Sequence, residues 1–158
     1  MIKQIQHSEL ERCITVIQKS FSDTAKEFNL TKENCPTHTS FITMRNLQYH
    51  WDSGYLMYGY YLSNNLVGYV SLENKGNSIF ELRNLAVLPD YRRNGYGKHI
   101  LNFCKTKVKE LNGTKITIGI IEENTVLKNW YIANGFVHIG TKHFEHLPFT
   151  VGYMECVV

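Results

Sequence analysis

A turn suited to binding phosphate lies at residues 92–97, which read Arg-Arg-Asn-Gly-Tyr-Gly. It follows the apolar, strand-like residues 85–88 and opens a helix-like run over residues 96–111. The first N–H groups of a helix have no intrahelical acceptor, and the helix dipole favours negative charge there. Gly95 and Gly97 let the backbone come close to a ligand because neither carries a Cβ atom. The pattern predicts an anion site, although a Gly-x-Gly turn alone is common in proteins.

A second motif occupies residues 124–136, where Asn124, Tyr131, Gly135 and Phe136 form the pattern N-x(6)-Y-x(3)-G-F. A strand-like stretch separates it from the R-x-x-G-x-G pattern of residues 92–97. In this order and at this separation, the two motifs resemble the GNAT superfamily of acetyl-CoA-dependent N-acetyltransferases. The resemblance covers roughly the second half of the chain. It implies a mixed α/β (α+β) fold, in which helices flank a central, mostly antiparallel, splayed sheet.

The resemblance also implies acetyl-CoA as co-substrate. Its pyrophosphate is expected on the glycine turn, at Arg92, Arg93, Asn94, Gly95, Tyr96, Gly97 and Lys98. Its pantetheine arm carries amides, which can pair with a strand edge like an added strand. In the family this place belongs to the strand that here contains Leu85, Ala86 and Val87. Asn124 matches an asparagine that binds the same arm, and it can equally cap the helix that it begins.

Tyr131 is the candidate general acid. Asn124, Lys128 and Tyr131 are spaced i, i+4 and i+7, so they share one face of a helix. We therefore expect Lys128 beside the cofactor as well. A phenol with a reference pKa of about 10 holds its proton at neutral pH and can donate it to a departing thiolate. The alternative for Tyr131 is a packed aromatic side chain; the resemblance favours the catalytic role.

Glu81 is the candidate base, because an amine with a reference pKa of about 10.4 must lose a proton before it attacks. It lies on the strand that leads to the glycine turn. The histone-acetylating branch of the family has a base glutamate at the matching place, whereas other branches use ordered water. A pairing with Arg83 or a solvent-facing position is the alternative, and Glu73 is a weaker candidate. The resemblance implies direct attack in a ternary complex, as in most of the family. Cys104 lies within a predicted helix and suits the core, so a cysteine relay is not expected.

The acceptor is expected to be a primary amine of a small molecule or peptide. In this fold it would meet the thioester beneath the first two helices and the loop between them, in the region of residues 28–53. Candidate lining residues are His38, Thr39, Phe41, Tyr49, Trp51, Tyr58 and Tyr60. A loop over residues 138–146 could also border the site. Its histidines do not have the spacing of helical metal ligands, so no metal is expected.

The elements that must position these residues follow from hydrophobic periodicity. Helices are predicted over residues 9–28, 40–51, 96–111 and 124–134, the first with a capping box of Ser8 and Glu11. Strands are predicted over residues 2–6, 55–62, 66–72, 78–88, 114–121, 136–141 and 149–157. The strand at residues 114–121 is almost uniformly apolar and β-branched, which is typical of a buried position.

Composition limits the classes of function. The 158 residues suit one domain over residues 1–158, and 43% hydrophobic content supplies a core. A net charge of +3 with no basic run gives no reason to expect nucleic acid. No apolar stretch reaches membrane-spanning length, and the N-terminus does not resemble a signal peptide. The four scattered cysteines form no Cys-x-x-Cys pair. A cytoplasmic location is therefore expected, and a homodimer is compatible with exposed strand edges.

Two other interpretations of the sequence compete with an acetyltransferase. A non-catalytic acyl-CoA-binding or regulatory module could keep the fold, but it would have no need of Tyr131. A dinucleotide-binding domain would need a third glycine where this chain has Ile100, and no Walker lysine follows the turn. The acetyltransferase interpretation is therefore preferred.

Overall fold

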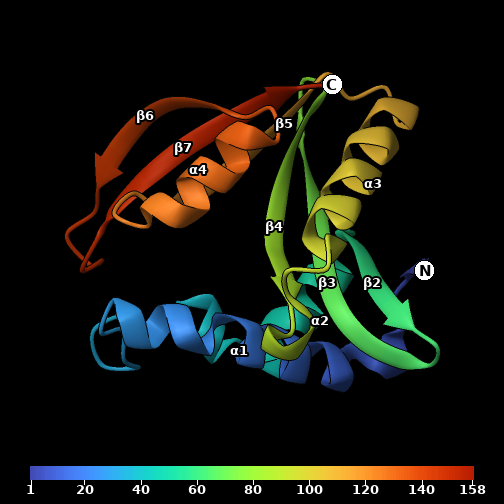
Figure 1. Cartoon of the computed structure of the whole chain (residues 1–158), viewed down its shortest axis with the longest axis horizontal. Helices are drawn as coiled ribbons and strands as arrows, with labels where there is room; N and C mark the ends of the chain where they lie inside the picture. Colours follow the sequence, from blue (N-terminus) through green and yellow to red (C-terminus); the bar gives the residue numbers. More distant parts are fainter.

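A seven-stranded sheet forms the centre of the computed structural model, which describes residues 1–158 (Figure 1). The strand order is β1-β2-β3-β4-β5-β7-β6, and only β4 and β5 run parallel. The strands are β1 (Ile2–Gln4), β2 (Leu56–Leu62), β3 (Asn65–Gly76), β4 (Ile79–Val87), β5 (Lys115–Ile121), β6 (Val137–His143) and β7 (Thr150–Val157). The helices are α1 (Leu10–Glu27), α2 (Met44–Asp52), α3 (Tyr96–Glu110) and α4 (Thr125–Ala133), with 3-10 turns η1 (His7–Glu9), η2 (Thr39–Phe41) and η3 (Pro89–Tyr91). The predicted mixed α/β, mostly antiparallel fold is confirmed.

The sheet splits between its two parallel strands. β4 and β5 pair only from Ile79 with Lys115 to Glu81 with Thr117, and no pair follows. Figure 1 shows the result as a V, whose arms meet near the C-terminus and diverge below it. We call β1–β4 the first arm, and β5, β7 and β6 the second arm. The predicted splay is therefore present, and it leaves one edge of β4 and one edge of β5 unpaired.

A bulge in β4 sharpens the divergence. The register between β3 and β4 shifts after Tyr69, and Asn84 has a left-handed φ of 56°. Asparagine is among the few residues that adopt this conformation readily. The bulge reverses the alternation of β4 side chains, so Leu82 and Leu85 both pack against the core beneath α3. It lies where the arms have just separated.

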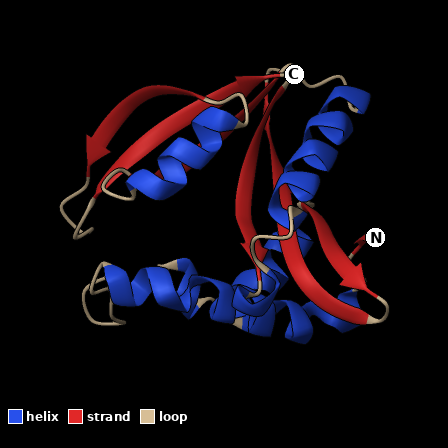
Figure 2. Ribbon diagram, in the orientation of Figure 1, coloured by secondary structure: helices blue, strands red, loops and turns tan.

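The helices cover the two faces of the sheet unequally. Figure 2 shows α3 along the first arm, α4 along the second, and α1 across the open end of the V. The larger core lies under α3 and α4 and includes Ile100, Cys104 and Met154. A second core joins α1 and α2 to the other face through Leu10, Ile17 and Tyr69. That face is uncovered over much of β5 and β7, where Thr117 and Tyr153 are only partly buried.

Several predicted boundaries were wrong for local reasons. The first helix starts at Leu10 after a 3-10 turn, and the capping box is formed by Gln6 and Glu9 instead of Ser8 and Glu11. The Gln6 amide donates to the Glu9 carboxylate at 2.8 Å. The second helix starts at Met44 instead of residue 40, because Thr43 and Asn46 cap each other.

The strand predicted over residues 136–141 is β6, which continues to His143 through residues that were also expected to form a loop, and β3 extends to Gly76. Both strands carry polar residues at sheet edges or hairpin ends. These residues therefore looked like loops in the sequence, where pairing with a neighbouring strand is not visible.

Candidate active site

A row of unpaired backbone N–H groups lines the turn before α3. None of the amides from Arg93 to Lys98 donates a hydrogen bond to another backbone group. Arg93 and Gly95 have φ angles of 63° and 80°, and left-handed residues alternating with others direct successive N–H groups toward one point. Arg93 and Lys98 add exposed cationic side chains. The turn therefore offers free amides and positive charge, which are the features that an anion site needs.

Arg92 is engaged within the protein. Its guanidinium donates to the Val87 carbonyl at 3.2 Å, to the Ser20 carbonyl at 2.5 Å and to the Asp23 carboxylate at 2.5 Å. Burial opposes ionisation of Asp23, but the hydrogen bond and charge of Arg92, together with backbone donors, outweigh it and lower the pKa of that carboxyl. Arg92 thus joins α1, the end of β4 and the glycine turn, and its side chain is directed away from the free amides.

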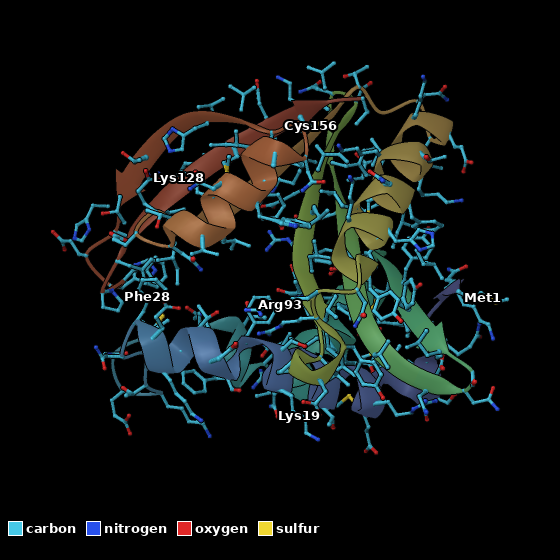
Figure 3. All side chains as sticks on the ribbon, viewed as in Figure 1. Met1, Lys19, Phe28, Arg93, Lys128 and Cys156 are labelled. Carbon is cyan, nitrogen blue, oxygen red and sulfur yellow. The ribbon has the colours of Figure 1, made fainter.

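Two other side chains of the turn make their contacts within the protein. Asn94 Nδ2 donates to the carbonyls of Tyr91 and Arg92, at 3.1 and 3.2 Å. The Tyr96 ring packs against Tyr60 with ring centroids 4.8 Å apart. What these residues offer a ligand is their main chain, whereas Arg93 and Lys98 can also offer charge. Figure 3 shows Arg93 beside the lower end of the first arm, Lys128 on the second arm, and Phe28 at the end of α1.

The unpaired edge of β4 lies directly beyond the bulge. It contains Leu85, Ala86 and Val87, the residues expected to hold the pantetheine arm. No strand pairs with them on the β5 side. Apart from the Val87 carbonyl, which accepts a hydrogen bond from Arg92, the backbone groups on this edge are available to an extended, amide-bearing ligand. The edge leads straight to the free amides of the glycine turn, so one ligand could contact both.

Asn124 and Tyr131 lie on α4, across the opening from β4. The Asn124 side chain accepts a hydrogen bond from the Leu127 amide at 3.2 Å, which confirms its capping role and leaves Nδ2 without a partner. Tyr131 is 5% exposed and packs edge to face against Trp130 and Phe136. No hydrogen bond engages its hydroxyl within the chain. Burial raises the pKa of Tyr131, so this phenol stays protonated at neutral pH.

Lys128 is paired away from the glycine turn. Its ammonium group donates to Glu122, and His138 Nε2 lies 2.9 Å from the other carboxylate oxygen. The Lys128 hydrogen bond lowers the pKa of Glu122. The three side chains tie α4 to β5 and β6. The structure therefore places Lys128 in a structural ion pair, apart from the residues that surround the glycine turn.

Glu81 lies on the opposite face of the sheet, at the last residue pair before the arms separate. Its carboxylate accepts a hydrogen bond from Arg83 at 2.8 Å, and Lys75 lies 3.8 Å away. Glu73 contacts the same two cations and accepts a hydrogen bond from the Tyr55 hydroxyl at 2.6 Å. Burial alone would raise the pKa of Glu73, but these partners outweigh it and lower that pKa. The pairing of Glu81 with Arg83, weighed as an alternative, is thus present.

The expected acceptor residues are only partly brought together. Thr39 donates to Asn84 in the β4 bulge at 3.3 Å, and His38 and Phe41 pack edge to face beside it. Burial lowers the pKa of His38, which favours its neutral imidazole. Tyr49 is 64% exposed, and Trp51 packs against His7. The expectation for Tyr58 and Tyr60 was wrong, because both lie on the α3 face.

Two residues on the acceptor face were not singled out from the sequence. Asn84 forms the bulge, and the sequence feature that could have revealed it is an asparagine inside an otherwise strand-like run. Gly119 is an exposed position in β5, and its signal was a lone glycine among β-branched residues. A hollow of about 550 Å³ at the other end of the sheet, lined by Lys3, Glu9, Arg12 and Tyr61 among others, lies away from both motifs.

Comparison with known proteins decides the family. The profile of the acetyltransferase (GNAT) family matches residues 21–136. The chain belongs to the GNAT acetyltransferase family. This match extends the resemblance beyond the two motifs into α1, and it includes the glycine turn, both strand edges and Tyr131.

Curated GNAT relatives match over part of their length. An N-acetyltransferase of unassigned substrate from Staphylococcus epidermidis is 32% identical over 98 residues, which cover 56% of this chain and 62% of that protein. One from Bacillus licheniformis is 42% identical over 65 residues, or 35% and 41% of the two chains. The chain thus spans less than two thirds of the length of these relatives.

Solved GNAT structures share the fold at low sequence identity. PaiA N-acetyltransferase from Thermoplasma acidophilum, solved with coenzyme A, has a TM-score of 0.84 at 20% identity and covers 100% and 98% of the two chains. A ribosomal-protein-alanine N-acetyltransferase from Brucella melitensis gives 0.76 at 16% identity, over 100% and 99%. An acetyltransferase from Bacillus anthracis, solved with acetyl coenzyme A, gives 0.61 at 22% identity, over 66% and 62%.

Two further observations describe the chain as a whole. None of its helices combines the length and the apolar character needed to cross a bilayer. No group of three or more His, Cys, Asp or Glu side chains is arranged to hold a metal ion, and all four cysteines are buried free thiols.

Proposed function

We propose that the protein transfers the acetyl group of acetyl-CoA to a primary amine of a small molecule or peptide. The observation that carries the proposal is the continuity of two sets of unpaired backbone groups. The free edge of β4 runs into the free amides from Arg93 to Lys98. The first set suits an amide-bearing arm and the second suits a pyrophosphate. Membership in the GNAT family, and relatives solved with coenzyme A or acetyl-CoA, support this assignment.

The two reactants enter the opening from its two faces. The α3 and α4 face carries the glycine turn, Asn124 and Tyr131 and receives acetyl-CoA. The α1 face carries Glu81 and receives the amine. The amine nitrogen attacks the thioester carbon directly, forming the C–N bond, and the C–S bond then breaks. Glu81 takes the proton that the ammonium group loses before attack, and Tyr131 supplies a proton to the departing sulfur. The second proton leaves the nitrogen as the amide forms and restores the Tyr131 phenol.

Arg83 bears on the role of Glu81. A carboxylate hydrogen-bonded to a guanidinium is held in a fixed orientation. Glu73 contacts the same Arg83, so the guanidinium is anchored from the neighbouring strand. We assign Glu81 the base because it lies at the separation of the arms, whereas Glu73 is one strand farther away and is bound to Tyr55.

Release of free thiol from acetyl-CoA tests the proposal directly. Purified protein is incubated with acetyl-CoA and a panel of amines that includes amino acids, aminoglycosides, polyamines and short peptides. Amine-dependent thiol release is the expected result. Tight acetyl-CoA binding in calorimetry without release by any amine would instead indicate an acyl-CoA-binding module. Absence of binding would contradict the proposal altogether.

A further inference from the structure

Gly135 and Phe136 end the second motif, yet neither takes part in the chemistry proposed above. They cap the C-terminal end of α4. Gly135 has a left-handed φ of 95°, and its amide donates to the Ile132 carbonyl at 3.1 Å. The Phe136 amide donates to the Tyr131 carbonyl at 3.0 Å. These are the two hydrogen bonds of a Schellman motif, so the cap is anchored on Tyr131 itself.

A lysine from a different helix binds this cap. Lys105 Nζ, on α3, donates to the Asn134 carbonyl at 2.5 Å and lies 6.0 Å from the centre of the Phe136 ring. A Cβ atom built at Gly135 would lie 3.4 Å from the same nitrogen, so the ammonium group is close to the bare glycine backbone. The C-terminal end of a helix has carbonyls without intrahelical donors and the negative end of the helix dipole, and both favour a cation there.

The other lysines near the end of α3 have ordinary surface positions. Lys107 pairs with Glu110 of the same helix at 2.9 Å, and Lys109 is exposed. Lys105 is partly buried and forms no ion pair with a carboxylate. Ordering a lysine side chain and withdrawing its ammonium group from water both cost free energy. The contacts of Lys105 with the cap of α4 offset that cost.

The contact between Lys105 and Asn134 crosses from one arm of the sheet to the other. α3 lies along the first arm and α4 along the second (Figure 1). No other hydrogen bond joins α3 to α4 or to its cap. Apolar contacts, such as that of Trp130 beside Gly97, also hold the helices together. Apolar contacts have no preferred direction, whereas a hydrogen bond constrains both distance and angle. Lys105 therefore fixes where the end of α4 lies along α3.

Tyr131 lies within the reach of this constraint. It is three residues before Asn134, and its ring packs edge to face against Phe136 with centroids 5.1 Å apart. Lys105 and Tyr131 thus contact the same aromatic ring. The helix that carries Lys105 begins at the free amides assigned to the pyrophosphate. One rigid helix therefore relates the position of Tyr131 to that of the bound cofactor.

A direct effect of the Lys105 charge on the phenol would be a different role. Burial raises the pKa of Tyr131, and the Cys104 thiol adds to the rise. A nearby ammonium group would lower that pKa instead, and no cation does so. Lys105 therefore bears on where the hydroxyl lies and leaves its acidity unchanged.

We infer that Lys105 is a positioning residue, which docks the cap of α4 on α3 and thereby holds the Tyr131 hydroxyl within reach of the departing sulfur. The inference rests on the proposed function, in which Tyr131 donates a proton to that sulfur. Position matters here because a proton donor must come within about 2.6–3.2 Å of its acceptor, and a misplacement of about 1 Å can cost on the order of 10²-fold in rate. Gly135 leaves room for the ammonium group, and Phe136 lies against both side chains.

A double-mutant cycle with Tyr131 tests this inference. Lys105→Met keeps an apolar chain but removes the donor, and it should lower kcat on the order of tenfold with little change in the KM for acetyl-CoA. Lys105→Arg keeps a cationic donor and should recover most of the loss. In the Tyr131→Phe background, which has no hydroxyl to place, Lys105→Met should cause no further loss. Lys109→Met removes an exposed lysine from the same helix, and this control should keep wild-type kinetics.

Thermal melts and calorimetry accompany the kinetics. Each variant is assayed well below its Tm, and the acetyl-CoA affinity of Lys105→Met should equal that of wild type. A loss of kcat that is equal in the wild-type and Tyr131→Phe backgrounds would make Lys105 a purely structural residue and overturn the inference. An unchanged kcat in Lys105→Met, or no recovery in a folded Lys105→Arg protein, would overturn it as well.

The same measurements distinguish failure of the inference from failure of the proposed function. If Tyr131→Phe turns over like wild type, Lys105 has no proton donor to place. The inference then fails, whereas acetyl transfer itself stands. A wild type that neither binds acetyl-CoA nor releases thiol contradicts the proposed function and the inference together.

Discussion

Tyr131 holds its proton more firmly than an exposed tyrosine, because burial disfavours the phenolate. If the departing thiolate takes that proton, Tyr131→Phe should lower kcat by a factor of about 10²–10⁴ and change the KM for acetyl-CoA little. Steady-state kinetics with the best amine from the panel measures both constants.

A loss of packing could imitate this effect, so the comparison needs a structural reference. Phenylalanine keeps the ring that contacts Trp130 and Phe136, and the Tm of Tyr131→Phe should therefore match that of wild type. Wild-type turnover in a well-folded Tyr131→Phe protein would remove this hydroxyl from the mechanism.

Glu81 and Glu73 share Arg83 and Lys75 but differ in position, which allows a matched pair of variants. Glu81→Gln removes the proposed base and should lower kcat/KM by a factor of about 10²–10⁴ at neutral pH, with partial recovery as rising pH deprotonates the free amine. Glu73→Gln keeps Glu81 and should cost far less. A pH–rate profile for both variants decides the assignment, and equal losses would count against Glu81.

At the residue scale, the sequence indicated which residues belong to the candidate site better than it indicated where their side chains point. The glycine turn and Tyr131 were found because their spacing resembles that of a known family. The Arg92 side chain was expected at the pyrophosphate, yet Ser20 and Asp23, far away in the sequence, accept its hydrogen bonds. No local pattern encodes such partners, because they depend on how α1 crosses the end of the sheet.

At the scale of elements, α4 begins at a residue with two candidate roles. Asn124 Oδ1 caps the helix, while Nδ2 is free to donate to the pantetheine arm. Asn124→Ala loses both, and should cost about 1 kcal/mol of stability, or roughly 2–4 °C in Tm, and raise the KM for acetyl-CoA. Asn124→Asp keeps a capping acceptor but loses the donor. It should hold its Tm and still bind acetyl-CoA more weakly.

Thermal melts and calorimetry on the two variants separate capping from binding. An Asn124→Asp protein with wild-type affinity would reduce Asn124 to a helix cap. The same logic explains the misplaced helix starts, since Gln6, Glu9, Thr43 and Asn46 also form caps that the sequence did not single out. Periodicity located each helix, but side-chain hydrogen bonds chose its first residue.

At the scale of the whole molecule, the V could be expected only through the family resemblance. Nothing in the composition of β4 or β5 says that their pairing stops at Glu81 and Thr117. Strand order and register depend on contacts between distant residues, which hydrophobic patterns do not report. Once the arms separate, the glycine turn before α3, the α4 helix and strand β5 surround one opening.

A ligand that joins the arms should stabilise the whole protein. Acetyl-CoA at about one hundred times its Kd adds about 2.7 kcal/mol to the stability of the folded state, which corresponds to a rise of roughly 5–11 °C in Tm.

Gly97→Val should abolish that rise, because its side chain projects beside Trp130 at the free amides while its backbone remains helical. Lys109→Val, exposed at the other end of α3, imposes the same unfavourable helix residue and should keep the full rise. Scanning calorimetry with and without acetyl-CoA measures all three proteins. If Gly97→Val keeps the ligand-induced rise, the pyrophosphate does not sit on these amides, and the division of the opening into a cofactor face and an amine face loses its basis.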